Sequence, residues 1–262
     1  MKVLHDIRHE LVEYSKRLSR LAEQGSASHI EELEAVISDY SGFVTNQSNK
    51  EAWNGFEELD SDSFQTILHA LRTDSARCVA IMEKNRAIKL LDEADAKSSY
   101  FQNIEACILQ EFRHFNVTAE SNVLLVGSGA FPMTPLHIAR QTGASVVGID
   151  IDDEAVSLGR QVVARLGPEL SIRLERATIE ELDGMDTITH VVFSSTVKEK
   201  YRILDRLYDL TRGEVAVAMR FGDRLKSIFN YPSEDVDKRK WKVEGTHLQQ
   251  ELVFDIIYYR RV

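Results

Sequence analysis

The sequence contains little cysteine, little proline and no long apolar run, and each shortage argues against a class of protein. Its two cysteines, Cys78 and Cys107, stand in no CxxC pair and in no other metal-ligand spacing, and both fall in stretches that predict helices. No apolar run approaches the ~20 residues that cross a bilayer, and residues 1–6 carry no signal-peptide core. We therefore expect a cytoplasmic protein that does not contact a membrane.

The chain also lacks an excess of basic residues. It has 42 acidic against 32 basic residues and a net charge of −10, with the two signs interleaved. Nucleic-acid binding depends on clustered Lys and Arg, so we expect no nucleic-acid partner. The eight histidines are scattered and predict no metal site. These features favour no particular oligomeric state, and a homodimer is compatible with them.

The first 115 residues contain no proline and repeat apolar residues at intervals of three and four. This period is typical of amphipathic helices, and Gly25 and the polar run 46–49 indicate breaks between them. We expect about five or six helices, which form an all-helical bundle over 1–118. The apolar stripes are Leu11, Tyr14, Leu18, Leu21; Leu33, Val36, Ile37, Tyr40; and Cys78, Val79, Met82, Ala87.

From residue 122 onward, strand-like runs alternate with helical ones. Helical stretches near 135–141, 153–166 and 198–210 lie between most of the strands, and the alternating segments after Trp241 predict an antiparallel hairpin at the sheet edge. Such alternation is typical of a doubly wound sheet, so we expect a Rossmann-like α/β domain over 119–262. The predicted strands, short apolar runs of the kind buried on both faces, are 123–126, 146–150, 172–175, 190–193 and 215–219.

A glycine loop follows the first predicted strand. Gly127, Ser128 and Gly129 allow a tight turn and a close approach of a ligand to the main chain, with the N-terminus of the next helix facing it. Asp150 ends the second strand about 20 residues later, where a carboxylate can accept both hydroxyls of a ribose. A GxG alone is a weak signal, but one between a buried strand and a helix predicts a site for a nucleotide-like cofactor.

The departures of this loop from common patterns indicate which cofactor it holds. Pro132 stands where a dinucleotide loop needs its third glycine. The loop also departs from the usual methyltransferase pattern G-x-G-x-G, because Ala130 and Phe131 follow its second glycine. A loop with no room for a pyrophosphate favours S-adenosylmethionine. For the hydroxyls that follow the third and fourth strands, N-capping of the next helix is an equally good explanation. The further candidate contacts are Ile151, Ala177, Thr178, Ser194 and Ser195.

In these segments the chain resembles the nicotianamine synthase family, especially the bacterial members that make opine-type metallophores such as staphylopine. The loop G-S-G-x-x-P-x-T is more specific than a bare GxG. The resemblance implies transfer of the 3-amino-3-carboxypropyl (aminobutanoyl) group of S-adenosylmethionine to the α-amine of histidine, with release of 5′-methylthioadenosine. In staphylopine-type systems the acceptor is D-histidine, which is therefore the isomer implied here. The resembling segments are 79–84, 100–105, 124–134, 148–152 and 219–222.

The resemblance also implies roles for single residues. Glu83 matches the family's catalytic glutamate and would take the proton of the attacking amine, although periodicity alone makes it a solvated helix charge. Tyr100 matches a hydrogen-bonding tyrosine; the alignment also allows Asn103 in this role, and core packing is the plain alternative. Arg220, which ends the fifth strand, is a candidate for a two-pronged bond to the acceptor carboxylate, with a surface ion pair as the alternative. Tyr231 lies on a loop that could close the pocket.

Two other functions fit parts of the pattern. The α/β half is also compatible with a small-molecule methyltransferase, which would release S-adenosylhomocysteine instead of methylthioadenosine. The long helical half is compatible with a non-catalytic interaction module that carries a vestigial Rossmann domain, which would not bind S-adenosylmethionine.

Overall fold

The structure, a computed structural model, describes residues 2–25, 29–55, 61–92, 108, 111 and 115–262. Within this part of the chain the N-terminal half consists of four helices, α1 (Lys2–Gln24), α2 (Ile30–Thr45), α3 (Gln47–Asn54) and α4 (Asp62–Leu91). The predicted break at Gly25 is present, but the predicted break over 46–49 is limited to Asn46, because residues 47–49 form the first turn of α3. Asn46 separates α2 from α3, and its side chain accepts a hydrogen bond from the Asn49 backbone N–H. No helix in these described ranges is long and apolar enough to cross a bilayer.

The C-terminal half forms one seven-stranded sheet with the strand order β3-β2-β1-β4-β5-β7-β6. Strands β1 to β5 run parallel, and β7 pairs antiparallel with both β5 and β6. All five predicted parallel strands and the predicted edge hairpin are confirmed. The strands are β1 (Asn122–Val126), β2 (Ser145–Asp150), β3 (Ile172–Arg176), β4 (His190–Phe193), β5 (Ala216–Phe221), β6 (Trp241–His247) and β7 (Asp255–Arg261).

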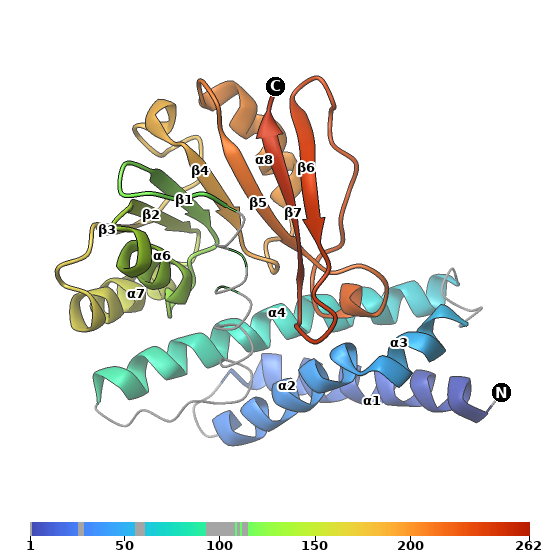
Figure 1. Cartoon of the computed structure of the whole chain (residues 1–262). Helices are drawn as coiled ribbons and strands as arrows, with labels where there is room; N and C mark the ends of the chain where they lie inside the picture. Colours follow the sequence, from blue (N-terminus) through green and yellow to red (C-terminus); the bar gives the residue numbers. More distant parts are fainter. Residues whose placement is uncertain (1, 26–28, 56–60, 93–107, 109–110, 112–114) are drawn as a thin grey trace.

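Helices cover both faces of this sheet (Figure 1). Helices α6 (Met133–Thr142) and α7 (Asp153–Leu166) lie on one face, and α8 (Lys200–Leu210) lies on the other. Alternate residues of β1 show why. Val123 and Leu125 pack in the cluster that holds the α6 residues, while Leu124 and Val126 pack in the cluster that holds the α8 residues. The remaining short elements are the 3₁₀ helices η2 (Met185–Thr187) and η3 (Arg224–Ile228).

The helical half and the sheet meet at η3, below which α4 passes (Figure 1). Leu225 and Ile228 are buried in the same cluster as the apolar faces of α1, α2 and α4. The Tyr40 hydroxyl of α2 donates to the Ile228 carbonyl at 2.9 Å. On the sheet side, buried Lys226 pairs with buried Asp255 of β7 at 2.6 Å. The two halves therefore share a buried core here, and a division into 1–118 and 119–262 stays a prediction.

Lys226→Met should lower the free energy of unfolding by about 3–5 kcal/mol, because it leaves the Asp255 carboxylate buried without its cation. The double variant Lys226→Met/Asp255→Leu should recover part of this loss. Chemical denaturation measures all three. Lys240→Met is the matched control, since it breaks a 2.7 Å pair with Asp205, a residue whose side chain is 55% exposed, and should cost less than about 1 kcal/mol. Equal losses at the two sites would contradict the role given to Lys226.

Candidate functional site

The glycine loop leaves the end of β1 in a conformation that other residues rarely adopt. Gly127 has φ +82° and Gly129 has φ +65°. The N–H groups of Gly127 and Ser128 both donate to the Ile149 carbonyl, at 2.9 and 3.0 Å, so the loop folds back onto β2. A Cβ on Gly127 would lie 2.7 Å from the Val197 side chain. The close approach of the segment after β4 therefore also requires glycine here.

Asp150 at the end of β2 holds this loop from the other side. Its Oδ2 accepts the Gly129 N–H at 2.9 Å, and its Oδ1 accepts the Asp152 N–H at 3.1 Å. The acidic partner predicted from the sequence thus lies beside the glycine loop. Each carboxylate oxygen keeps a lone pair, and the residue lines the adjacent cavity.

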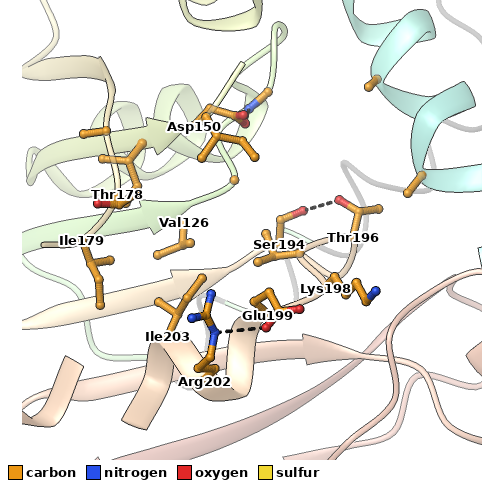
Figure 2. Close-up of a pocket in the computed structure, with 18 of the residues that line it drawn as sticks. Val126, Asp150, Thr178, Ile179, Ser194, Thr196, Lys198, Glu199, Arg202 and Ile203 are labelled. Carbon is orange, nitrogen blue, oxygen red and sulfur yellow. Dashed lines mark hydrogen bonds and ion pairs between the residues drawn. The ribbon is translucent and has the colours of Figure 1, made fainter. Parts of the chain in front are cut away.

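A cavity of about 530 Å³, called here the main cavity, lies over the carboxyl ends of β1, β2 and β4 (Figure 2). Its floor is apolar around Val126, Ile179 and Ile203, and charged groups including Lys198, Glu199 and Arg202 stand around it. Ile151 lines it although 78% of the residue is exposed. The predicted cofactor contacts that line it are Gly127, Gly129, Asp150, Ile151, Ala177, Thr178 and Ser194.

Helix α4 closes the main cavity with one face. Ala76, Val79, Ala80 and Glu83 line it, and their spacing of three and four places them in one stripe along the helix. The first three of these residues have small apolar side chains, and Glu83 ends the stripe with a carboxylate. A carboxylate at the end of an apolar stripe is the local signal that could have marked this residue without any resemblance.

The Glu83 carboxylate lies directly against the glycine loop. A Cβ on Gly129 would be only 2.1 Å from Glu83 Oε2, so no other residue fits at position 129 without moving the carboxylate. The Ala130 backbone N–H donates to the same carboxylate. The interpretation of Glu83 as a solvated helix charge, which periodicity alone favours, is therefore wrong.

Its surroundings change the acidity of Glu83. Burial raises the pKa of this carboxyl to about 8, and the negative charge of Asp150 acts in the same direction. The Ala130 N–H and the positive charge of Arg86 oppose the shift but do not cancel it. With this pKa the carboxyl is largely protonated at neutral pH.

A second space of about 60 Å³, called here the polar chamber, adjoins the main cavity. Glu83, Gly127, Ser194 and Thr196 line both, so Glu83 stands where the two meet. The residues that line the polar chamber alone include the predicted contacts Ser128, Ser195 and Arg220, together with Leu125, Phe131, Met133, Thr134 and Phe254.

Arg220 is buried, with 5% of its surface exposed, so the surface ion pair considered for it is wrong. Its guanidinium makes a two-pronged bond to Glu111, with Nη2–Oε2 at 2.5 Å and Nε–Oε2 at 3.1 Å. Nη2 also donates to the Thr134 hydroxyl at 3.0 Å, and the Phe254 ring lies 5.0 Å from the guanidinium carbon. Sequence reasoning missed Glu111, which lies 109 residues away and in no motif.

The predicted hydroxyl residues do not cap a following α-helix. Helix α8 has Glu199 as its N-cap residue, while the Ser194 hydroxyl is 3.1 Å from that of Thr196 (Figure 2). The Thr178 N–H and hydroxyl both donate to Glu181. Ser128 Oγ is buried and has no hydrogen-bond partner among the described residues.

The other predicted contacts lie elsewhere. Ala130 is buried beside Glu83, and Pro132 is the N-cap residue of α6; neither lines the two spaces. Tyr231 lines neither of them, and its carbonyl accepts a hydrogen bond from the Lys200 ammonium at 2.7 Å. Tyr100 and Asn103 lie outside the described residues. Within the described ranges, no three His, Cys, Asp or Glu side chains are grouped to hold a metal ion.

Comparison with known proteins gives relatives for most of the chain, although no family model matches it. L-histidine 2-aminobutanoyltransferase from Pseudomonas aeruginosa (strain UCBPP-PA14) is 27% identical over 225 residues, which cover 86% of this chain and 85% of the relative. The protein of the same name from Yersinia pestis is 30% identical over 176 residues, 67% and 65% of the two chains. The chain is homologous to these transferases.

Solved structures agree on the fold. Nicotianamine synthase MtNAS in complex with MTA and tNA superposes with a TM-score of 0.79 at 14% identity, covering 98% of both chains. A point mutant of MtNAS in complex with S-adenosylmethionine gives 0.75 at 14% identity, covering 95% of this chain and 98% of the mutant. The likeness extends over both halves of the chain, so the helical half belongs to the shared fold.

Glu83→Gln should become more stable relative to the wild type as pH rises from 4.5 to about 8. Over this range the unfolded chain ionises Glu83 while the folded chain keeps it protonated, so the wild type loses stability as pH rises, and the glutamine has no such loss. Denaturation of both proteins across this range measures the difference. Glu181→Gln is the control: bonds from Thr178 lower the pKa of Glu181 below 4.5, so its difference from the wild type should stay almost constant over this range and change only at lower pH. A difference between Glu83→Gln and the wild type that is independent of pH would contradict the assignment.

Proposed function

We propose that this chain is an aminobutanoyltransferase that moves the 3-amino-3-carboxypropyl group of S-adenosylmethionine to the α-amine of histidine and releases 5′-methylthioadenosine. One observation carries the proposal. A carboxylate of raised pKa, Glu83, lies against the glycine loop at the junction of the main cavity and the polar chamber. The names of its homologues and its fold support the same activity.

The residues of the main cavity suit S-adenosylmethionine. Its volume of about 530 Å³ falls in the range of pockets for ligands of this size. Asp150 has lone pairs for the ribose hydroxyls, and the apolar side chains of Ile151, Ile179 and Ile203 suit an adenine ring. The Glu83 carboxyl fills the space beside Gly129 that a pyrophosphate would need, and the negative charge of Asp150 next to it would attract a sulfonium.

The positive charge of the co-substrate would also prepare the base. A sulfonium beside Glu83 and Asp150 would favour the ionised form of Glu83 and so lower its pKa from about 8. The carboxylate would then be ionised when both substrates are present. Glu83 would thus become a competent base only in the loaded site.

The reaction requires one proton transfer and one substitution. The α-amine of an amino acid is largely protonated at neutral pH, so Glu83 would first take a proton from the ammonium. The neutral nitrogen then attacks the carbon that joins the aminocarboxypropyl arm to sulfur. The new C–N bond forms as the C–S bond breaks, and its electron pair leaves on sulfur, which becomes neutral in methylthioadenosine. In-line orientation selects this carbon among the three on the sulfonium.

The polar chamber suits the charged end of an amino acid. Its volume of about 60 Å³ is small beside that of the main cavity and suits a carboxylate or an ammonium. Ser128 supplies a buried hydroxyl without a partner among the described residues, and Arg220 supplies a cation that Glu111 already partly neutralises. We propose that this chamber binds such a head group through Ser128, Ser195 and Arg220. Roles for Tyr100, Asn103 and Tyr231 stay predictions.

The proposed acceptor differs in configuration from the D-histidine expected from the sequence. The resemblance to staphylopine-type enzymes implies D-histidine, whereas the homologues are named for L-histidine. We therefore propose the L-isomer as the preferred acceptor.

Cellular location and partners follow from composition. A net charge of −10 supports the absence of a nucleic-acid partner. We propose a cytoplasmic location; among the described residues Cys78 is a free, buried thiol. The absence of membrane contact and a homodimer stay predictions.

Incubation of the protein with S-adenosylmethionine and L-histidine should release methylthioadenosine and a single-adduct product, both visible by mass spectrometry. D-Histidine, tested in parallel, should react more slowly. Glu83→Gln should lower kcat by about 10²–10⁴-fold, because loss of one acid–base group has this typical cost. Its affinity for S-adenosylmethionine, measured by calorimetry, should change less than tenfold. Glu244→Gln, on an exposed part of β6, is the control. S-adenosylhomocysteine as product would indicate a methyltransferase instead.

The pH–rate profile should follow the ionisation of Glu83. The value of kcat/KM for S-adenosylmethionine reports the free enzyme and should rise with pH up to about 8, because the base works only when ionised. The corresponding limb of kcat should lie at lower pH, since the bound sulfonium favours the carboxylate. Glu83→Gln should lack this limb. A wild-type kcat/KM that is flat between pH 6 and 8 would count against Glu83 as the base.

A further inference from the structure

Next to Glu83, Lys84 joins α4 to the N-terminus of α7. Its ammonium lies 2.7 Å from Asp152 Oδ2 and 2.6 Å from Glu154 Oε2. Only 22% of the Lys84 side chain is exposed. Asp152 is at the same time the N-cap residue of α7, with Oδ1 accepting the Ala155 N–H at 3.1 Å. Each oxygen of Asp152 thus has its own donor, and the ion pair is tied to a fixed helix end.

These contacts continue to the carboxylate of the site. The Asp152 N–H donates to Asp150 Oδ1 at 3.1 Å, and Asp150 Oδ2 accepts the Gly129 N–H at 2.9 Å. Gly129 is the residue against which Glu83 lies. The path from Lys84 through Asp152, Asp150 and Gly129 therefore returns to Glu83, its neighbour on α4. Lys84 itself lines neither the main cavity nor the polar chamber.

We propose that Lys84 is a positioning residue, which holds α4 at a fixed height over the glycine loop and so keeps Glu83 in its place between Gly129 and Asp150. The inference rests on the proposed function for its effect on rate. An ion pair this close to the surface contributes little to global stability. Its effect is on geometry, and a displacement of about 1 Å in a reacting group can lower a rate by up to 10²-fold.

Two variants, Lys84→Met and Asp152→Asn, distinguish an effect of charge on the pKa of Glu83 from an effect of position. Among the described residues, the charges that act on Glu83 are those of Asp150 from β2 and Arg86 from α4 itself. If the Lys84 network acted on Glu83 only through charge, Lys84→Met would remove a cation and raise its pKa, and Asp152→Asn would remove an anion and lower it. If the network acts through position, both variants loosen α4, hydrate Glu83 and lower its pKa. Asparagine keeps the helix cap, so Asp152→Asn isolates the ion pair.

The test is steady-state kinetics of the full-length protein with S-adenosylmethionine and L-histidine across pH. Lys84→Met and Asp152→Asn should each lower kcat by about tenfold or more, with KM for S-adenosylmethionine changed less than threefold. In both, the acid limb of kcat/KM should move to lower pH, and Lys84→Arg should restore the wild-type profile. Lys240→Met, which breaks a pair of the same length on the far side of the sheet, should behave as the wild type. Opposite shifts in the two variants, or unchanged profiles in both, would overturn the proposal.

A second measurement does not depend on the reaction. The pH-dependent difference in unfolding free energy between Glu83→Gln and its parent should shrink in a Lys84→Met background, because a hydrated Glu83 ionises more normally in the folded chain. If wild-type protein released no methylthioadenosine, the proposed function would fail while this measurement still decided the role of Lys84. An undiminished difference would reject the positioning role.

Discussion

The site depends on one contact, the Glu83 carboxylate in the space that a side chain at position 129 would fill. The contact needs a glycine with φ +65°, the Ala130 N–H aimed at the oxygen, and a helix that passes over the carboxyl ends of the parallel strands. Two sets of contacts fix the position of α4. Lys84 of α4 pairs with Asp152 at the N-terminus of α7, and η3 packs in the helical core while its Lys226 pairs with Asp255 of β7.

That contact brings two acidic residues, Glu83 and Asp150, to the same side of the main cavity. Burial, and after it the negative charge of Asp150, raise the pKa of Glu83 to about 8 and so keep a proton on it at neutral pH. A cationic ligand removes the need for that proton. Under the proposed function, attraction of the co-substrate and creation of the base are therefore two results of one electrostatic arrangement, and the acceptor would meet an ionised base only after the sulfonium is in place.

Local patterns in the sequence predict most of the fold and part of the site. Apolar runs of four to six residues and the glycine turn depend on neighbouring residues, so the strands, their hairpin and the loop beside Asp150 were predictable. The Arg220–Glu111 pair was not, because it joins residues 109 apart and no motif marks either partner for the other. Glu83 was found by resemblance, since helical periodicity treats any charge as solvated unless its stripe is followed to the end. The polar chamber could not be foreseen either, because it arises only where β1, β5, α4 and α6 converge.

The position of Val79 couples the stability of the helical half to ligand binding in the main cavity. It is buried in the core of the helical half, and it also lines both the main cavity and the polar chamber. Loosening of the bundle would therefore open the cavity wall, and occupancy of the cavity would oppose that loosening by mass action. Ligand binding would in this way stabilise the helical half. Its resistance to proteolysis should report how full the cavity is, even in a protein that never turns over.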